Sequence, residues 1–473
     1  MNYSDAQFKR KQIKKYVFFI FAVFILTLLF VKDAFASDTY VKILNNKTVQ
    51  YSASLPEIPI SDDDVIYLYE LKTYENAIPD SATPIASVPI SSRVSIRFSL
   101  NHKQEDTRLY SKFVLATKVN DTPVMINTPK YITNPEKLAT HTKEHKDINK
   151  ALQHESITNL VIKGTGNIPL ASNPVVVLLA RKGSVITHPL CSVKDSHPID
   201  YQYCMFNAAN EEGVNGLIKD LTYEAAYSKG QDFIVGNEVH ERVWNYMAYV
   251  DWKAYVKEYA KAFRVCYNAI KSENANAKVY ISLGQDWNRD RDYTHPEFFK
   301  YIDAKDFVDI FNEEISAGGN IDWAIAIHPY TVPLTYAKFW DMDRLKDGDY
   351  FAEQIISNKM ISFQNLSVET DYLAKFKNPQ GEPRTMFISE IGLSNTSGDK
   401  VQAAAIAASW MAYKRNPYIS GYMYLSNIGD GVDSRLVGQG LKMYKALGTK
   451  NEDAMLNWAK SYIGITDWDE ILR

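Results

Sequence analysis

The feature that most constrains the fold is a regular alternation of apolar strand-like segments and helical patterns in the second half of the chain. The strand-like segments begin at residues 232, 278, 322 and 385, so they lie 46, 44 and 63 residues apart. Repeated strand–helix units of this size predict a parallel sheet, and enough of them predict closure into a (β/α)8 TIM barrel. We therefore expect an α/β protein with such a barrel over residues 141–473.

An open, doubly wound sheet is the alternative architecture. It is disfavoured because no strand-like segment is followed by a complete glycine-rich phosphate loop, since the pairs Gly164/Gly166 and Gly438/Gly440 both lack the third glycine. Further strands are predicted at 203–207 and 419–425, and helices at 211–227, 251–270, 296–317, 360–376 and 399–414. The first two strand–helix units of the barrel fall close together, near 157–182, and their strands and helices have no clear assignment.

The region before residue 140 has a different pattern. Short β-rich runs at 65–71, 94–100 and 110–119 are separated by clusters of Pro, Ser and Asp. An antiparallel β-sandwich fits this pattern. We expect a β-sandwich domain with its connector over residues 37–140, and the polar stretch at 141–150 marks the boundary with the barrel.

The N-terminus has the pattern of a secretory leader. Five cations precede an apolar run at 16–31, and Ala34-Phe35-Ala36 forms a small-x-small cleavage signature before Ser37. A helix of that length covers about 24 Å, short of the roughly 30 Å of a bilayer core. We expect a signal peptide over residues 1–36, cleaved near Ala36-Ser37, and a secreted or surface-exposed protein. An uncleaved leader acting as a membrane anchor is the alternative.

Composition excludes several classes of protein. Hydrophobic residues make up 46% and charged residues 23%, as in soluble globular chains, and the formal net charge of −3 gives no reason to expect a nucleic-acid partner. The three cysteines, Cys191, Cys204 and Cys266, lack CxxC spacing, which argues against a disulfide scaffold or structural zinc. We expect no metal or other cofactor and a monomeric protein.

Each predicted barrel strand ends in polar residues. The ends read Asn237-Glu238, Gln285-Asp286-Trp287, His328-Pro329-Tyr330 and Ser389-Glu390. In a parallel barrel the catalytic groups come from these carboxyl ends. Glu238 and Glu390 would face each other across the mouth, and two such carboxyl groups suit glycoside cleavage, one as an acid and the other as a nucleophile or a base.

These motifs resemble those of clan A glycoside hydrolases, which use an Asn-Glu acid/base on the fourth strand and a later Glu nucleophile with retention. More closely, the strings Ile-Val-Gly-Asn237-Glu238, His328-Pro-Tyr330 and Ile-Ser-Glu390, with Val332-Pro-Leu-Thr335 and Asn416-Pro-Tyr-Ile419, are similar to a bacterial secreted barrel family described only as domain of unknown function 5722. The similarity covers about half of the chain.

The resemblance implies roles for individual residues. Glu238 would be the acid/base, Glu390 the nucleophile, Asn237 the partner of a substrate 2-hydroxyl, and Tyr330 a donor to the nucleophile. One departure is the end of the eighth strand, where clan A enzymes commonly place a Trp beneath the sugar and this chain reads Met423-Tyr424-Leu425. Either Tyr424 takes the place of that Trp beneath the sugar, or this chain has no aromatic platform there.

Aromatic residues are abundant, with 31 Tyr and 8 Trp. Because sugars stack on aromatic rings, Trp244, Trp287 and Tyr424 join Asn237, His328 and Tyr330 as expected substrate-binding residues. His328 has no second His at ligand spacing and is not expected to bind metal. We thus predict a retaining glycoside hydrolase acting on an unidentified oligo- or polysaccharide; the alternative is a catalytically silent carbohydrate-binding or surface-interaction protein on the same barrel.

Overall fold

The computed structural model describes residues 39–57, 59–101, 107–139, 175–177, 207–227, 232–241, 252–289, 302–429 and 432–472. The chain divides into two compact units, Met1–Asn101 with Ser111–Thr133 and His102–Tyr110 with Asn134–Arg473. The expected leader, residues 203–206 of the expected strand at 203–207, Cys191, Cys204 and Trp244 lie outside the described residues.

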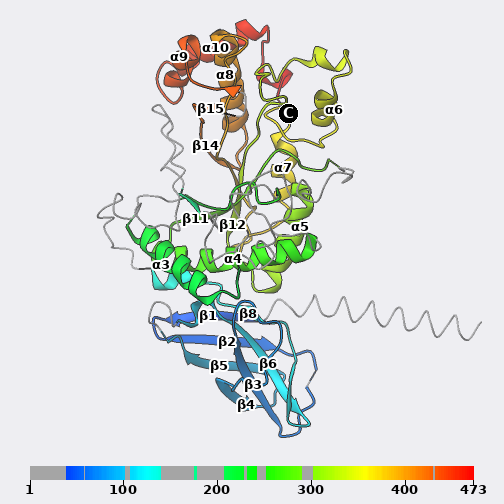
Figure 1. The fold of residues 1–473 in the computed structure, drawn as a ribbon, viewed down its shortest axis with the longest axis vertical. Helices are drawn as coiled ribbons and strands as arrows, with labels where there is room; N and C mark the ends of the chain where they lie inside the picture. The colour runs from blue at the N-terminus through cyan, green and yellow to red at the C-terminus, as the bar shows by residue number, and fades with distance from the viewer. Residues whose placement is uncertain are drawn as a thin grey trace, which may run out of the picture. The chain divides into compact units, whose positions relative to one another are not determined.

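The first unit consists of antiparallel strands (blue to cyan in Figure 1). One sheet has the order β1-β2-β5 and the other the order β4-β3-β6-β7, with β8 paired to β6. Alternate residues of β5, Val94, Ile96 and Phe98, are buried, as expected for a strand with one apolar face. The strands are β1 (Tyr40–Asn45), β2 (Thr48–Ser54), β3 (Val65–Leu71), β4 (Ala86–Pro89), β5 (Arg93–Ser99), β6 (Lys112–Val119), β7 (Thr122–Met125) and β8 (Lys130–Tyr131).

The second unit is built on a parallel sheet. Its described strands are β9 (Val175–Val177), β10 (Asp232–Val235), β11 (Lys278–Leu283), β12 (Trp323–Ile327), β13 (Met386–Ile388) and β14 (Ile419–Tyr422). They pair in chain order from β9 to β14, and every pairing is parallel. A doubly wound sheet reverses its strand order at a switch point, and these six strands show no reversal. The alternation predicted for an α/β fold is confirmed.

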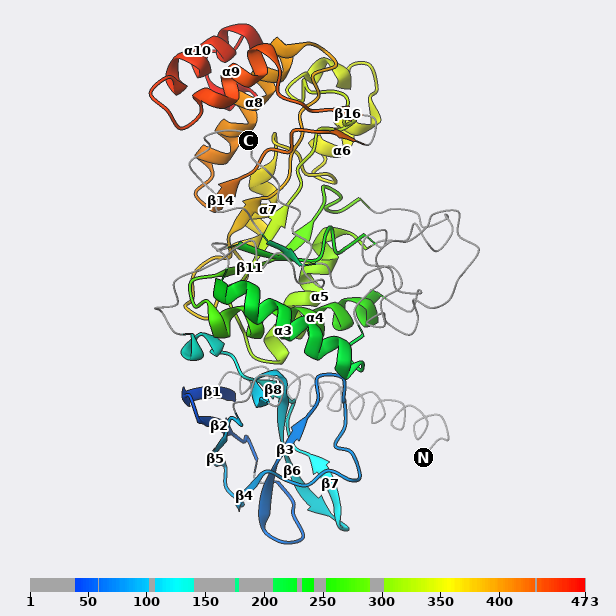
Figure 2. The same cartoon turned by 60° about the vertical axis from the view of Figure 1, so that its left-hand side comes forward.

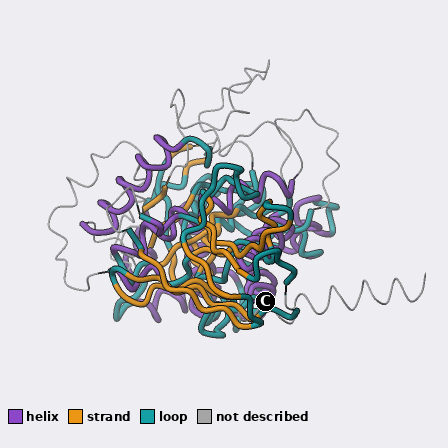
Figure 3. Tube along the Cα trace, turned by 90° about the horizontal axis from the view of Figure 1, so that it is seen from below, coloured by secondary structure: helices purple, strands orange, loops and turns teal. Residues whose placement is uncertain are grey.

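Helices α3 to α8 occupy the intervals between these strands in the chain, and α9 and α10 follow the last of them (Figures 2 and 3). They are α3 (Glu211–Tyr227), α4 (Trp252–Glu273), α5 (Ala304–Ala317), α6 (Tyr350–Ile356), α7 (Leu366–Leu373), α8 (Asp399–Arg415), α9 (Gly438–Ala446) and α10 (Glu452–Ile463), with a hairpin of β15 (Ile428–Gly429) and β16 (Val432–Asp433) after β14. Within these ranges, no helix combines the length and the apolar character needed to cross a bilayer.

Helix α7 is shorter than the helix predicted at 360–376. The side chain of Asn365 explains the late start, because it accepts the N–H of Ser362 and donates to the carbonyls of Ile355 and Met360. These bonds hold residues 360–365 in a turn instead of a helix.

Helix α4 has the apolar face that the sequence predicts. Tyr259, Phe263 and Cys266 on that face are all buried.

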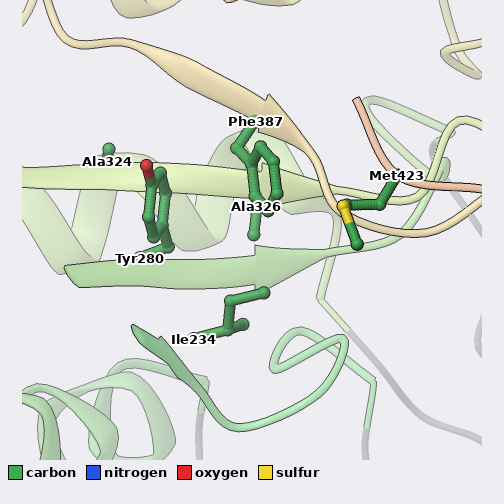
Figure 4. Packing of buried hydrophobic residues seen from close by; sticks show 6 residues of the cluster. All are labelled: Ile234, Tyr280, Ala324, Ala326, Phe387 and Met423. Atoms are coloured by element: carbon green, nitrogen blue, oxygen red, sulfur yellow. The ribbon is translucent and has the colours of Figure 1, made fainter. Parts of the chain in front are cut away.

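Successive strands of the second unit contribute side chains to one buried cluster. Figure 4 shows Ile234 of β10, Tyr280 of β11 and Phe387 of β13 in this cluster, with Ala324, Ala326 and Met423. The rings of Tyr280 and Phe387 lie 5.5 Å apart between centroids. Because β11 and β13 are not adjacent in the sheet, this contact indicates that side chains on one face converge.

Helix α7 also carries a buried carboxyl group, Glu369, which has 0% exposure and no hydrogen-bond partner for either oxygen among the described residues. Burial raises the pKa of Glu369 from 4.5 to about 8. Since the folded pKa is the higher one, the stability of the folded state is greatest below the unfolded pKa and declines as the pH rises through about 8.

Glu369→Gln should therefore remove a pH-dependent loss of stability. Between pH 5 and pH 8.5 the wild type should lose about 4 kcal/mol of unfolding free energy through this group, and the variant should not. Urea unfolding at the two pH values measures the difference. Asp371→Asn, an exposed carboxyl on the same helix, is the matched control. An unchanged pH dependence in Glu369→Gln would contradict the burial argument.

Candidate active site

The polar residues predicted at the strand ends gather at one edge of the parallel sheet. Asn237 and Glu238 follow β10, His328 and Tyr330 follow β12, and Glu390 follows β13. All five line one cavity of about 250 Å³. Because the strands are parallel, their carboxyl ends meet at the same edge, which explains how residues 152 positions apart (390 − 238) come together.

Glu238 is held by a tight turn after β10. Its backbone has a φ of 41°, in the left-handed region that a side chain of this size seldom adopts. The turn is fixed from β11, because the N–H of Glu238 donates to Ser282 Oγ at 3.0 Å and the N–H of Val239 donates to the Ser282 carbonyl at 2.8 Å. Unfavourable backbone geometry at a residue fixed in this way is typical of functional sites.

His328 lies between the two glutamates. Its Nδ1 is 3.0 Å from Oε1 of Glu238, and its Nε2 is 4.0 Å from Oε2 of Glu390. The hydroxyl of Tyr330 donates to Oε1 of Glu390 at 2.6 Å. The Glu238 and Glu390 side chains are 19% and 22% exposed, whereas that of His328 is 4% exposed. Both carboxylates are thus oriented by fixed neighbours yet open to the cavity.

The pKa of His328 lies above its ordinary value of 6.5. Burial acts to lower it, but the negative charge of Glu390, the hydrogen bond with Glu238 and the charge of Glu238 together outweigh burial. The imidazole therefore keeps a proton to higher pH than an ordinary histidine does. A cationic His328 would reduce the repulsion between the two carboxylates.

Two of the expected substrate-binding aromatics, Trp287 and Tyr424, do not line the cavity. Trp287 is 3% exposed and packs edge-on against Tyr372, with ring centroids 5.3 Å apart, because its backbone N–H is tied to the Lys359 carbonyl. Tyr424 is 0% exposed, and its hydroxyl lies 3.0 Å from the Ser434 carbonyl and 3.1 Å from that of Leu393. Tyr424 therefore does not replace the missing Trp platform.

Other lining residues were not predicted as site residues. Glu241 lines the cavity three positions after Glu238. This short spacing within one turn is the sequence signal that would have identified Glu241 as a site residue. Gln285, at the end of β11, belongs to a polar strand end visible in the sequence. The rest of the cavity wall comes largely from the segment after β14, where the sequence gives no clear signal for the hairpin. The lining residues from this segment are Leu425, Asn427, Val432 and Ser434, and Leu334 and Gly392 complete the wall.

A second cavity, of about 350 Å³, lies away from these carboxylates, between α7, the end of α8 and the C-terminal segment. None of the predicted site residues lines it. Over the described part of the chain, no group of three or more His, Cys, Asp or Glu side chains is arranged to hold a metal ion.

Comparison with known proteins gives one family match. The model of a family of unknown function, DUF5722, matches residues 171–471, which confirms the resemblance to that family. No curated protein matches the chain.

Among solved structures, the chain is similar to glycoside hydrolases. A β-glucosidase from Pyrococcus furiosus has 13% identity and a TM-score of 0.32, covering 53% of this chain and 62% of its own length. An endo-β-1,3-glucanase from Sorangium cellulosum has 15% identity and a TM-score of 0.30, covering 49% and 76%. A β-D-glucuronidase from Dictyoglomus thermophilum has 8% identity and a TM-score of 0.31, covering 86% and 67%. The chain thus spans less than two thirds of the length of the Pyrococcus enzyme.

Proposed function

The chain belongs to the family of unknown function DUF5722, and we propose that its second unit is a retaining glycoside hydrolase with Glu238 as acid/base and Glu390 as nucleophile. One observation carries the proposal: the carboxylates of both residues approach the same imidazole, that of His328, within one cavity. Two carboxyl groups flanking a cavity are what cleavage of a glycosidic bond requires.

The same contacts support closure of the sheet into a (β/α)8 barrel. In the strand order, β11 lies between β10 and β12, so β10 and β12 would be about 10 Å apart in a flat sheet. Glu238 after β10 nevertheless lies 3.0 Å from His328 after β12. The two side chains thus reach across the end of β11, as expected for strand ends that line one mouth. The proposal also includes packing of the two N-terminal sheets as a β-sandwich.

The proposed reaction uses these contacts. Because Tyr330 holds Oε1 of Glu390, Oε2 is the oxygen available to attack the anomeric carbon. The bond from that carbon to the leaving oxygen breaks as Glu238 gives its proton to that oxygen. His328, 3.0 Å from Oε1 of Glu238, faces the carboxylate that this proton transfer leaves behind. Glu238 then takes a proton from water, the water attacks the anomeric carbon, and Glu390 is released.

Tyr330→Phe should lower kcat by about tenfold to a hundredfold with little change in KM, because it removes one hydrogen bond to a charged group. The matched control is Tyr336→Phe, which removes a tyrosine–carboxylate bond of equal length, to Asp341, outside the cavity lining. Steady-state kinetics on an aryl glycoside compare the two variants. Equal loss in both variants would indicate that Tyr330 has only a structural role.

We propose further that the protein is secreted after cleavage near Ala36-Ser37, with a carbohydrate as its substrate and no nucleic-acid partner. The support is the cationic and apolar pattern of residues 1–36. An uncleaved leader would keep the same unit at the membrane surface. In either case the substrate would be an extracellular glycan.

A panel of α- and β-linked nitrophenyl glycosides tests the proposed function. The wild type should release nitrophenol from at least one member, and the Glu390→Ala variant should release none. If wild type and variant are both inactive on the panel and on an oligosaccharide panel, the glycosidase proposal fails. Binding of an oligosaccharide without cleavage would favour the catalytically silent carbohydrate-binding protein.

A further inference from the structure

The segment that carries the proposed nucleophile, residues 390–395, follows β13. The carbonyl of Ile391, the next residue after Glu390, accepts the N–H of Leu425 at 2.6 Å. Leu425 belongs to the segment after β14 and lines the cavity. The segments after β13 and β14 are thus hydrogen-bonded to each other beside the nucleophile, and their mutual placement affects where the Glu390 carboxylate lies.

The two segments also pack closely at Gly392 and Ser434, which both line the cavity. A Cβ on Gly392 would lie 2.9 Å from Ser434 Oγ, closer than such atoms pack. Ser434 Oγ in turn donates to the Leu425 carbonyl at 2.8 Å. The backbone just after Glu390 therefore lies directly against the cavity wall.

One buried side chain of α8 joins the two segments. Gln402 is 0% exposed, and its Nε2 donates to the Leu393 carbonyl at 2.9 Å and to the Arg435 carbonyl at 3.0 Å. Leu393 comes three positions after Glu390, and Arg435 comes directly after Ser434. Because a side-chain amide has two N–H donors, Gln402 can satisfy both carbonyls at the same time.

Tyr424 cannot make this connection alone. Its hydroxyl lies 3.1 Å from the Leu393 carbonyl and 3.0 Å from the Ser434 carbonyl, but a hydroxyl has one proton to donate. Gln402 supplies the donors that Tyr424 lacks. Buried polar groups that are satisfied in this way fix one arrangement of the segments they join.

We propose that Gln402 is a positioning residue for Glu390, which it holds in place through the Leu393 and Arg435 carbonyls. The inference rests on the proposed glycosidase function and adds to it a residue that is not among the described lining residues of the cavity. Attack on the anomeric carbon needs an accurately placed oxygen, and a displacement of about 1 Å can cost about a hundredfold in rate. An interaction that matters chiefly in the transition state affects kcat more than KM.

Two variants disturb Gln402 by independent routes. Gln402→Met keeps the length of the side chain and removes both donors. Gly440→Ala, on α9, keeps the amide but adds a Cβ 2.1 Å from its oxygen, so the end of the Gln402 side chain has to move. The matched controls are Ser409→Ala, which removes a buried hydrogen bond between α8 and Tyr422, and Gly216→Ala, at a helical glycine with open space around it.

Turnover and local order are measured separately on the full-length proteins, and thermal melting verifies that each variant is folded. On an aryl glycoside that the wild type cleaves, Gln402→Met and Gly440→Ala should lower kcat by about tenfold to a hundredfold and change KM by less than about threefold. Hydrogen–deuterium exchange should become faster in the peptides that contain residues 390–395 and 432–436. Both controls should leave kcat and the exchange of these peptides unchanged.

An unchanged kcat in both Gln402→Met and Gly440→Ala overturns the assignment even if exchange becomes faster, because Gln402 would then have only a structural role. An equal loss of kcat in Ser409→Ala also overturns it, since loss of any buried hydrogen bond of α8 would have the same effect. If Gln402→Met does not fold, Gly440→Ala decides the test. A wild type that is inactive on the glycoside panels refutes the glycosidase itself, and with it the nucleophile that Gln402 positions.

Discussion

Replacement of Glu390 by alanine should abolish turnover of every glycoside that the wild type cleaves. The expected fall in kcat/KM is about 10⁴-fold or more, because no other group can form the covalent bond that a nucleophile forms. Its position supports the role: Oε1 is held by Tyr330, and the side chain opens into the cavity. The loss should be the same for good and poor leaving groups.

Rates on a series of aryl glycosides measure this loss, with Glu382→Ala as the control at an exposed carboxylate. Azide, a small anion that fits the space left by the carboxylate, should restore turnover of Glu390→Ala and give a glycosyl azide of inverted configuration. Near-wild-type activity without azide would exclude Glu390 as the nucleophile.

Replacement of Glu238 by alanine should have an effect that depends on the leaving group. General acid catalysis contributes about 10² to 10⁴ in rate, and least where the leaving group needs no proton. The variant should therefore keep substantial activity on a dinitrophenyl glycoside and lose about 10² to 10⁴ on an alkyl glycoside.

The slope of log kcat/KM against the leaving-group pKa measures this dependence, and it should be steeper for Glu238→Ala than for the wild type. Equal losses for Glu238→Ala and Glu390→Ala on an activated substrate would contradict the division of roles. Wild-type activity in both variants would favour the carbohydrate-binding alternative.

Much of the second unit could be predicted from the sequence because its signals are local. The strand at 278–283 and the helix at 211–227 have the predicted bounds, since apolar runs and helical periodicity arise from neighbouring residues. The meeting of Glu238, His328 and Glu390 could also be predicted, because parallel strands place their carboxyl ends at one edge.

The wall of the cavity could not be predicted in the same way. Whether Trp287 and Tyr424 face the cavity or the core depends on contacts with distant segments, such as Tyr372 and the Ser434 carbonyl. The hairpin of β15 and β16 has strands of two residues each, too short to produce a periodic pattern. Tertiary contacts decide these features.

Trapping of the glycosyl-enzyme tests the central claim most directly. The protein is incubated with 2-deoxy-2-fluoro glycosyl fluorides of the sugars cleaved in the aryl glycoside panel, and its peptides are analysed by mass spectrometry. The account predicts one fluoroglycosyl group, attached to the peptide that contains Glu390 and absent in Glu390→Ala. Attachment to another residue, or no adduct together with an inverted product, would contradict it.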